Sequence, residues 1–393
     1  MDLKLIKLRS LINSSDKELD VLSENYIKEI EKRCGHVFKN DGKHIFFLIE
    51  SGGTEEIFIK IYKNYSAPYY LLTSGNSNSL AASIEILSFL KQNNLEGEII
   101  HGDIDYVSNK INSLVMCKEA LNTLKDTNLG VIGKPSDWLI ASNVDYKLIK
   151  DKLGINLIDI TSEELINEIN KDQYDLNLFK KYESYWNNKE VLRRALVIHQ
   201  ALLNLKEKYN LKGLTIRCFD LLGLYKNTSC LSLAILNASG VTATCEGDIP
   251  SMITMHLIRV LTGKSSFQAN PSRIDVNNNE ILFAHCTLPL DMTTSYKFKT
   301  HFESGLGIGI KGELKEEDIT VAKVSKDLND IIVYEGKILK NLEEEKLCRT
   351  QIVVKLDEDI SRLLKNPLGN HHIISYGRNK KLLTDFVTYI SNK

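Results

Sequence analysis

Short apolar runs alternate with helical patterns along the first third of the chain. Residues 44–50 (HIFFLIE), 69–73 (YYLLT) and 98–101 (EIIH) predict strands, and residues 79–91 (SLAASIEILSFLK) predict a helix. Polar turns that contain glycine follow the first two strands. The carboxyl ends of strands are where open α/β sheets bind ligands, so these turns are candidate binding loops.

A second α/β pattern begins near residue 129. It consists of a strand at 129–132, a polar turn at 133–139 (GKPSDWL), helices at 146–153 and 163–170 around a strand at 155–160, and a long helix at 191–208 before a strand at 214–219. The stretch from 129 to 219 therefore repeats the strand and helix alternation of the first.

After about residue 280 the pattern changes to short strands separated by Gly, Asn and charged turns. These strands are expected at 280–284, 307–311, 319–325, 330–339 and 351–356. The predicted fold class is α/β, with two N-terminal Rossmann-like units that contain parallel sheets, followed by a C-terminal domain resembling a β-barrel. We expect domains at 1–135, 136–275 and 276–393.

Charge and cysteine content narrow the functional classes. The 393 residues carry 50 Lys and Arg against 51 Asp and Glu, so no net field favours nucleic acid, and a small ligand is the better expectation. The seven cysteines form no C-x-x-C pair, which argues against disulfides and structural zinc. Neither a signal peptide nor a long apolar span is visible, so we expect a cytoplasmic protein without membrane contact.

The most unusual local sequence is TCEGDIPS at 244–251, followed by the apolar helical pattern MITMHLIRVLTG. Asp248 fits a helix N-cap, Pro250 fits the first turn, and Gly263 fits the helix end. Glu246 lies just ahead of this helix, where a carboxylate stays ionised and can bind a cation or accept a proton. Ordinary helix capping is the alternative interpretation of this motif.

Three later segments strengthen the functional interpretation: SFQANP at 266–271, FAHCT at 283–287 and GNHHI at 369–373. Together with the E-G-D motif and the helix that ends in LTGK, their order resembles the superfamily of L-fucose isomerase and L-arabinose isomerase. The resemblance covers about residues 210–375 well and the earlier part more loosely.

The resemblance implies an aldose-ketose isomerase that uses a divalent ion, usually Mn²⁺, and moves a proton between C1 and C2 through an enediol. It implies metal ligation by Glu246, Asn270, His285 and His372, with Glu246 also acting in proton transfer. It further implies sugar contacts from Trp138, Cys286 and His371. Carboxylate oxygen and imidazole nitrogen are suitable Mn²⁺ ligands, and a sugar diol can occupy the open positions.

The resemblance also implies a homotrimer or homohexamer with sites at subunit interfaces, in which the N-terminal domain closes over the site of a neighbour. One position departs from the family pattern. Asn270 stands where these enzymes have a carboxylate, and an amide cannot carry a proton. Asp248, Asp275 or Glu303 would have to substitute, and Glu303 is favoured because it precedes a Gly-rich turn.

Two other functions remain open. One is a carbohydrate-processing enzyme that acts on a modified or phosphorylated sugar, with Lys134 and Lys264 available for an anionic group and Cys286 or Glu303 taking part. The other is a sugar-binding or regulatory homologue that kept the pocket and lost the chemistry. For single residues the alternative is packing, with Trp138 as a core anchor at the start of a helix and His285 as a histidine at a strand end. A dinucleotide-binding enzyme is disfavoured because SGGT at 51–54 lacks the G-x-G-x-x-G spacing.

Overall fold

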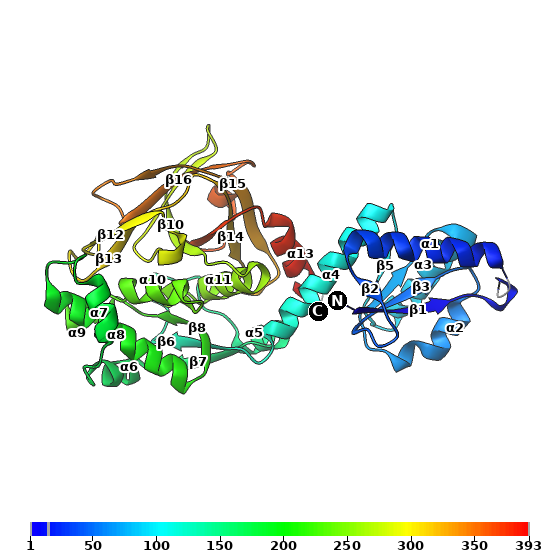
Figure 1. The fold of residues 1–393 in the computed structure, drawn as a ribbon, viewed down its shortest axis with the longest axis horizontal. Helices are drawn as coiled ribbons and strands as arrows, with labels where there is room; N and C mark the ends of the chain where they lie inside the picture. The colour runs from blue at the N-terminus through cyan, green and yellow to red at the C-terminus, as the bar shows by residue number, and fades with distance from the viewer. Residues whose placement is uncertain (1, 14–15, 392–393) are drawn as a thin grey trace. The chain divides into compact units, whose positions relative to one another are not determined.

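The computed structural model describes residues 2–13 and 16–391 and divides the chain into two compact units, Met1–Lys118 and Glu119–Lys393. The first unit contains a parallel sheet, and the second contains both a parallel sheet and a barrel (Figure 1). Strand β6 (Asn128–Ile132), which the sequence analysis assigned to the N-terminal domain, pairs within the sheet of the second unit.

The sheet of the first unit has the strand order β2-β1-β3-β4-β5 and is parallel throughout. Its strands are β1 (Asp2–Leu8), β2 (Val37–Phe38), β3 (His44–Ile49), β4 (Tyr69–Leu72) and β5 (Gly97–Ile100). Its helices are α1 (Lys17–Cys34), α2 (Glu55–Ile61), α3 (Ser79–Gln92) and α4 (Ile104–Leu124), which runs across the unit boundary. Strands β3 and β4 are nearly continuous buried apolar runs, as expected for parallel strands covered on both faces.

The parallel sheet of the second unit has the order β7-β6-β8-β9. The strands that join β6 are β7 (Asn156–Ile160), β8 (Leu211–Ile216) and β9 (Thr242–Cys245). The helices are α5 (Tyr146–Leu153), α6 (Ser162–Ile169), α7 (Leu176–Tyr182), α8 (Lys189–Lys208), α9 (Asp220–Tyr225), α10 (Cys230–Ala238) and α11 (Ile249–Thr262). Within residues 2–13 and 16–391, no helix has the length and apolar character needed to cross a membrane.

Six of the remaining strands form a closed antiparallel barrel in the order β10-β11-β16-β15-β14-β17. They are β10 (Phe267–Asp275), β11 (Glu280–His285), β14 (Asp318–Val324), β15 (Ile331–Leu342), β16 (Thr350–Leu356) and β17 (His372–Tyr376). A hairpin of β12 (Ser295–Lys299) and β13 (Gly309–Glu313) and the helices α12 (Arg362–Lys365) and α13 (Lys380–Ser391) accompany the barrel. The predicted fold class, parallel α/β units followed by a β-barrel, is confirmed.

Helix α11 connects the two layers of the second unit. It contacts β8 and β9 of the parallel sheet and β10, β14 and β17 of the barrel, and Figure 1 shows it between them. Residues 249–258 are all buried, which explains why this helix is apolar on nearly every side. The predicted caps are confirmed, because Asp248 accepts a hydrogen bond from the Ser251 amide at 2.9 Å and Gly263 has φ 69°.

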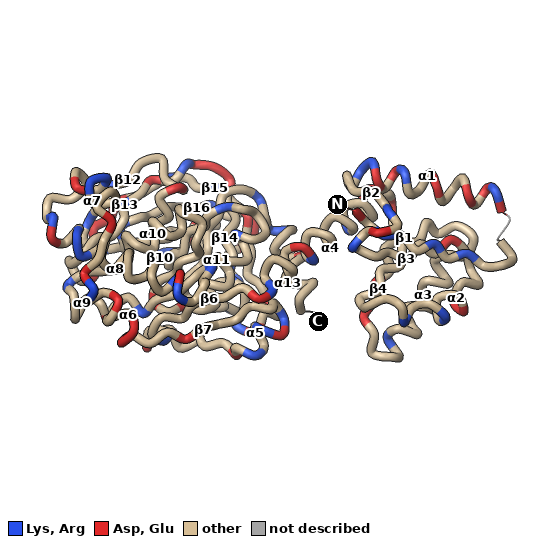
Figure 2. Tube along the Cα trace, turned by 60° about the horizontal axis from the view of Figure 1, so that its bottom comes forward, with Lys and Arg blue, Asp and Glu red and all other residues tan. Residues whose placement is uncertain are grey.

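Acidic and basic residues are interspersed over both units (Figure 2), in keeping with the net charge near zero. Charged side chains are seldom buried without a partner, because removal from water is costly. The second unit nevertheless buries Glu246, Asp248 and Lys323, which are 8%, 0% and 1% exposed. These three charged residues lie around the start of α11, which makes this region the candidate functional site.

Candidate metal centre and active site

The backbone at Glu246 turns sharply between β9 and α11. Glu246 has φ 65°, a left-handed conformation that residues other than Gly seldom adopt, and Gly247 follows with φ 71°. The Ser136 amide donates to the Glu246 carbonyl at 2.9 Å, and the Gly247 amide donates to the Ile216 carbonyl at 3.0 Å. These bonds attach the turn to the loops at the carboxyl ends of β6 and β8, so the direction of the Glu246 side chain is well determined.

Two imidazoles face the Glu246 carboxylate. Its Oε1 lies 3.5 Å from His371 Nε2 and 3.9 Å from His285 Nε2, and one ligand atom from each of the three residues lies within 4.8 Å of the others. The three side chains are buried and come from the β9 to α11 turn, the end of β11 and the residue just before β17. One carboxylate and two imidazoles form a group that can hold a divalent metal ion.

Electrostatics keeps Glu246 ionised. Burial alone would raise the pKa of Glu246, but hydrogen bonding and charge interaction with His285 and His371 outweigh burial and hold this pKa well below its usual range. Burial alone would lower the pKa of His371, but hydrogen bonds to Asp248 and Glu246 raise it to about 9. Without a cation, His371 is therefore protonated at neutral pH, and its positive charge faces Glu246 where a metal ion would otherwise lie.

The donor set fits a metal because Nδ1 of each imidazole is already hydrogen-bonded on the side away from Glu246. His285 Nδ1 is hydrogen-bonded to the Thr287 hydroxyl at 2.8 Å, and His371 Nδ1 is hydrogen-bonded to Asp248 Oδ2 at 2.8 Å. Each His therefore directs Nε2 toward Glu246. Nε2 of His371 lies 3.5 Å from Glu246 Oε1, and a cation bound between these two atoms would take the place of the proton on Nε2.

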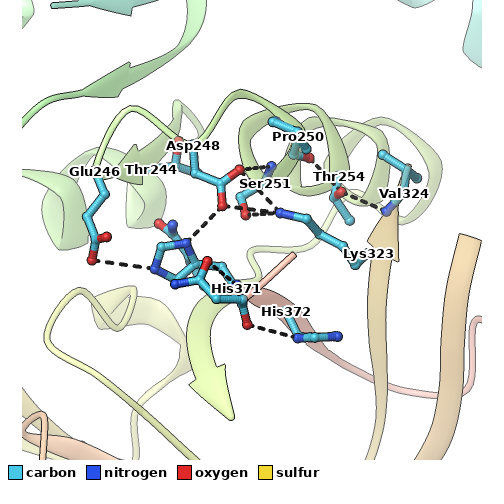
Figure 3. Close-up of polar contacts among 12 residues, drawn as sticks. Thr244, Glu246, Asp248, Pro250, Ser251, Thr254, Lys323, Val324, His371 and His372 are labelled. Carbon is cyan, nitrogen blue, oxygen red and sulfur yellow. Dashed lines mark hydrogen bonds and ion pairs between the residues drawn. The ribbon is translucent and has the colours of Figure 1, made fainter. Parts of the chain in front are cut away.

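His372, the His that the resemblance assigned as a ligand, does not belong to this group. Its Nδ1 is hydrogen-bonded to the Asn370 carbonyl at 3.1 Å, its ring packs against Phe283 at 6.2 Å, and burial lowers its pKa to about 4. His371 directly precedes β17 and His372 is the first residue of that strand, and only His371 faces Glu246. Figure 3 shows His371 directed toward Glu246 and His372 directed elsewhere.

Trp138 approaches Glu246 from the loop after β6. Its indole Nε1 donates to Glu246 Oε2 at 2.6 Å, and its ring meets Phe219 edge-on at 4.9 Å between centroids. Trp138 is 53% exposed, so it is not the core anchor that the packing alternative required. The contact gives Glu246 a hydrogen-bond donor on the oxygen that does not face the imidazoles.

The other predicted site residues line the same pocket as Glu246 and His285. Asn270, Cys286 and Glu303 are part of this pocket. Of the three substitutes considered for the second carboxylate, only Glu303 lines the pocket. Asp275 is exposed and bonded to its own turn, and Asp248 is fully enclosed by donors.

Several pocket residues were not singled out by the sequence analysis. His301 lines the pocket, and so do the thiols of Cys218, Cys230, Cys245 and Cys348. A hydrogen bond from Cys348 lowers the pKa of Cys286 to about 6. The buried Lys323 had a detectable signal, because it occupies an inward position of β14 in line with the core residues Ile319 and Val321.

The fold and the site thus define an α/β and barrel protein with a buried group of one carboxylate and two imidazoles that can hold a metal. No family model matches the chain. Part of the chain is similar to curated proteins named sulfoquinovose isomerase. They come from Alkalicoccus urumqiensis (22% identity over 301 residues, 68% of this chain and 62% of the relative), Priestia megaterium (24% over 260 residues, 63% and 57%) and a Clostridium species (22% over 298 residues, 69% and 65%). The chain therefore spans less than two thirds of the length of each.

Proposed function

We propose that the chain is a metal-dependent aldose-ketose isomerase with its active site at Glu246, His285 and His371. The observation that carries the proposal is the convergence of these three side chains, which are far apart in the sequence, on one buried point. The relatives named sulfoquinovose isomerase support the same reaction class. In this proposal His371 takes the ligand role that the sequence resemblance gave to His372.

A divalent ion such as Mn²⁺ would supply Lewis acidity toward the C1 and C2 oxygens of the sugar. The low pKa of Glu246 favours a ligand role for this carboxylate over a role as the base that removes a carbon-bound proton. Trp138 fixes the carboxylate from the side opposite the imidazoles. Asn270 offers an amide oxygen on the pocket wall but cannot act as an acid or base in proton transfer.

Glu303 is our candidate for the proton carrier. It is the exposed carboxylate of the pocket, so it can meet a sugar that enters from solvent. In the proposed reaction Glu303 takes the proton from C2 of the aldose, which leaves an enediolate. The hydroxyl proton passes from O2 to O1, and Glu303 returns its proton to C1 as the bond from C2 to O2 becomes the carbonyl. Cys286 and His301 lie in the same wall and would contact the substrate.

The names of the relatives favour a sulfonated hexose as substrate, which corresponds to the modified-sugar alternative of the sequence analysis. Lys134 and Lys264, considered there for an anionic group, do not line the pocket that contains Glu246. We also propose that the protein forms a homo-oligomer, trimer or hexamer, in which the N-terminal unit covers the site of a neighbouring subunit. The preferred substrate can be identified by assaying a panel of aldoses.

The test is incubation of the purified protein with Mn²⁺ and aldoses, sulfoquinovose among them, with ketose formation and deuterium exchange at C2 followed by NMR. We expect Glu246→Gln to lower turnover by about 100-fold or more. We expect Glu303→Gln to abolish C2 exchange while Mn²⁺ binding stays at the wild-type level. If no aldose gives ketose or C2 exchange with the wild type, the proposed function is wrong.

A further inference from the structure

The carboxylate of Asp248 lies directly behind His371 and is completely buried. On its other side is Lys323, whose side chain is 1% exposed. The Lys323 ammonium lies 3.2 Å from each oxygen of Asp248 and donates to the Ser251 hydroxyl at 2.8 Å. Figure 3 shows the resulting chain of contacts from Glu246 through His371 and Asp248 to Lys323.

Every group that surrounds the Asp248 carboxylate is a donor. Oδ1 accepts from the Ser251 amide at 2.9 Å and from Lys323, and Oδ2 accepts from Lys323 and from His371 Nδ1 at 2.8 Å. A carboxylate with this set of neighbours cannot give a proton to His371, so Nδ1 must carry one. Nε2 of His371 is then the nitrogen that faces Glu246 and that a cation would bind in place of a proton.

We propose that Asp248 is a positioning residue of the metal centre, with Lys323 as its counter-ion, and that the pair sets the tautomer and ring orientation of His371 so that Nε2 binds the cation. This inference rests on the proposed function, because it assigns Nε2 of His371 to a metal. It goes beyond helix capping, which requires only the bond from the Ser251 amide to Asp248.

Asp248 and Lys323 form a fully buried ion pair, and stability alone does not explain why two charged residues occupy these positions. Buried ion pairs add little net stability, because desolvation offsets their attraction. Helix α11 is joined to β14 at a second point by neutral groups alone, since the Val324 amide donates to the Thr254 hydroxyl at 3.2 Å and that hydroxyl donates to the Pro250 carbonyl at 2.7 Å. Packing of α11 against β14 therefore does not require a buried carboxylate or ammonium.

The decisive variant is Asp248→Asn. Its single oxygen would be drawn to the Ser251 amide and to Lys323, both of which can only donate, so the amide NH₂ would face His371. Nδ1 must then become an acceptor, and the proton moves to Nε2, where it blocks metal binding. We expect Mn²⁺ affinity, measured by titration calorimetry, to fall by about 10- to 100-fold.

Thr254→Val is the matched control, because it removes a buried hydrogen bond between the same helix and strand without touching His371. We expect it to lower stability and to leave Mn²⁺ affinity within about twofold of the wild type. Equal losses of affinity in the two variants, or wild-type affinity in Asp248→Asn, would overturn the inference and leave the proposed function standing.

A measurement on the wild type covers the case in which Asp248→Asn does not fold. In protein labelled with ¹⁵N-His and loaded with diamagnetic Zn²⁺, His371 should show a protonated Nδ1 and a metal-bound Nε2, with assignment by His371→Gln. Coordination through Nδ1 would refute the role of Asp248. If the wild type binds no divalent cation at all, the metal centre itself is wrong, and the inference is rejected with it.

Discussion

At the residue scale, the centre is governed by how each group is partnered. His371 lies between two carboxylates, Glu246 at 3.5 Å and Asp248 at 2.8 Å, and this position raises its pKa to about 9 in the metal-free protein. Metal ions bind only the unprotonated Nε2, so proton and cation compete for one atom. Between pH 6.5 and 9 the stability of the metal-free protein should therefore fall as pH rises, whereas that of the metal-bound protein should change little.

The predicted pH dependence follows from the direction of the shift. Because the folded pKa of His371 is raised above the ordinary 6.5, its contribution to the stability of the metal-free protein is complete below pH 6.5 and is lost as pH rises through about 9. Added Mn²⁺ should stabilise increasingly over the same range. Urea unfolding at several pH values, with and without Mn²⁺, measures both trends.

His371→Gln is the control for this prediction, because it removes the titrating group. Its metal-free stability should be flatter between pH 6.5 and 9 than that of the wild type. A slope as steep as that of the wild type would show that another group is responsible.

At the element scale, the turn between β9 and α11 determines where Glu246 points. The backbone of Gly247 passes so close to the loop after β6 that an added Cβ would lie 2.5 Å from the Lys134 carbonyl oxygen. Gly263, at the other end of α11, has nearly the same φ, 69° against 71°, but no atom within 4 Å of such a Cβ. The helix thus begins in a crowded turn and ends in an open one.

We predict that Gly247→Ala is far more disruptive than Gly263→Ala. Both variants force a left-handed backbone on Ala, at a cost of about 1–2 kcal/mol, and only Gly247→Ala adds the steric conflict that displaces Glu246. Urea unfolding should show a loss of about 1–2 kcal/mol for Gly263→Ala and a larger loss for Gly247→Ala, which should also weaken Mn²⁺ binding. Equal effects on Mn²⁺ binding would contradict the assigned importance of the turn.

At the scale of the whole molecule, each unit has its own hydrophobic core. The first unit is built around Phe47, Phe58 and Leu71, and the second unit contains separate cores for its parallel sheet and its barrel. Glu246, His285 and His371 all belong to the second unit. Metal binding and the proposed coverage of the site by the N-terminal unit of a neighbour should therefore be separable.

We predict that a fragment of residues 104–393, which keeps helix α4 whole, binds Mn²⁺ as tightly as the full chain and has lost turnover. Calorimetry and the NMR assay measure the two properties, and light scattering should show a trimer or hexamer for the full chain. Full turnover by the fragment, or a monomeric active protein, would contradict the proposed role of the N-terminal unit.

Local sequence was sufficient to determine most elements of the second unit. The caps at Asp248 and Gly263, and the alternation in the barrel strands, depend on neighbours a few residues away, and the structure confirms them. The sequence analysis assigned no element before residue 44, where the structure has β1 and α1, and there it missed local signals, since α1 is capped by Asp16 and Gly35 and buries Leu19 and Ile30 on one face. Glu246, His285 and the region of the His pair could also be identified as candidate chemistry.

Only the tertiary structure decided which groups meet. The choice of His371 over His372 depends on how the chain enters β17, which begins at His372 opposite Ala269 of β10 in the barrel. The bond from Trp138 to Glu246 spans 108 residues, and the contacts of Asp248 with Lys323 and His371 span 75 and 123. Helical and strand propensities act over a few residues, whereas such pairs form only when the sheet, α11 and the barrel pack together.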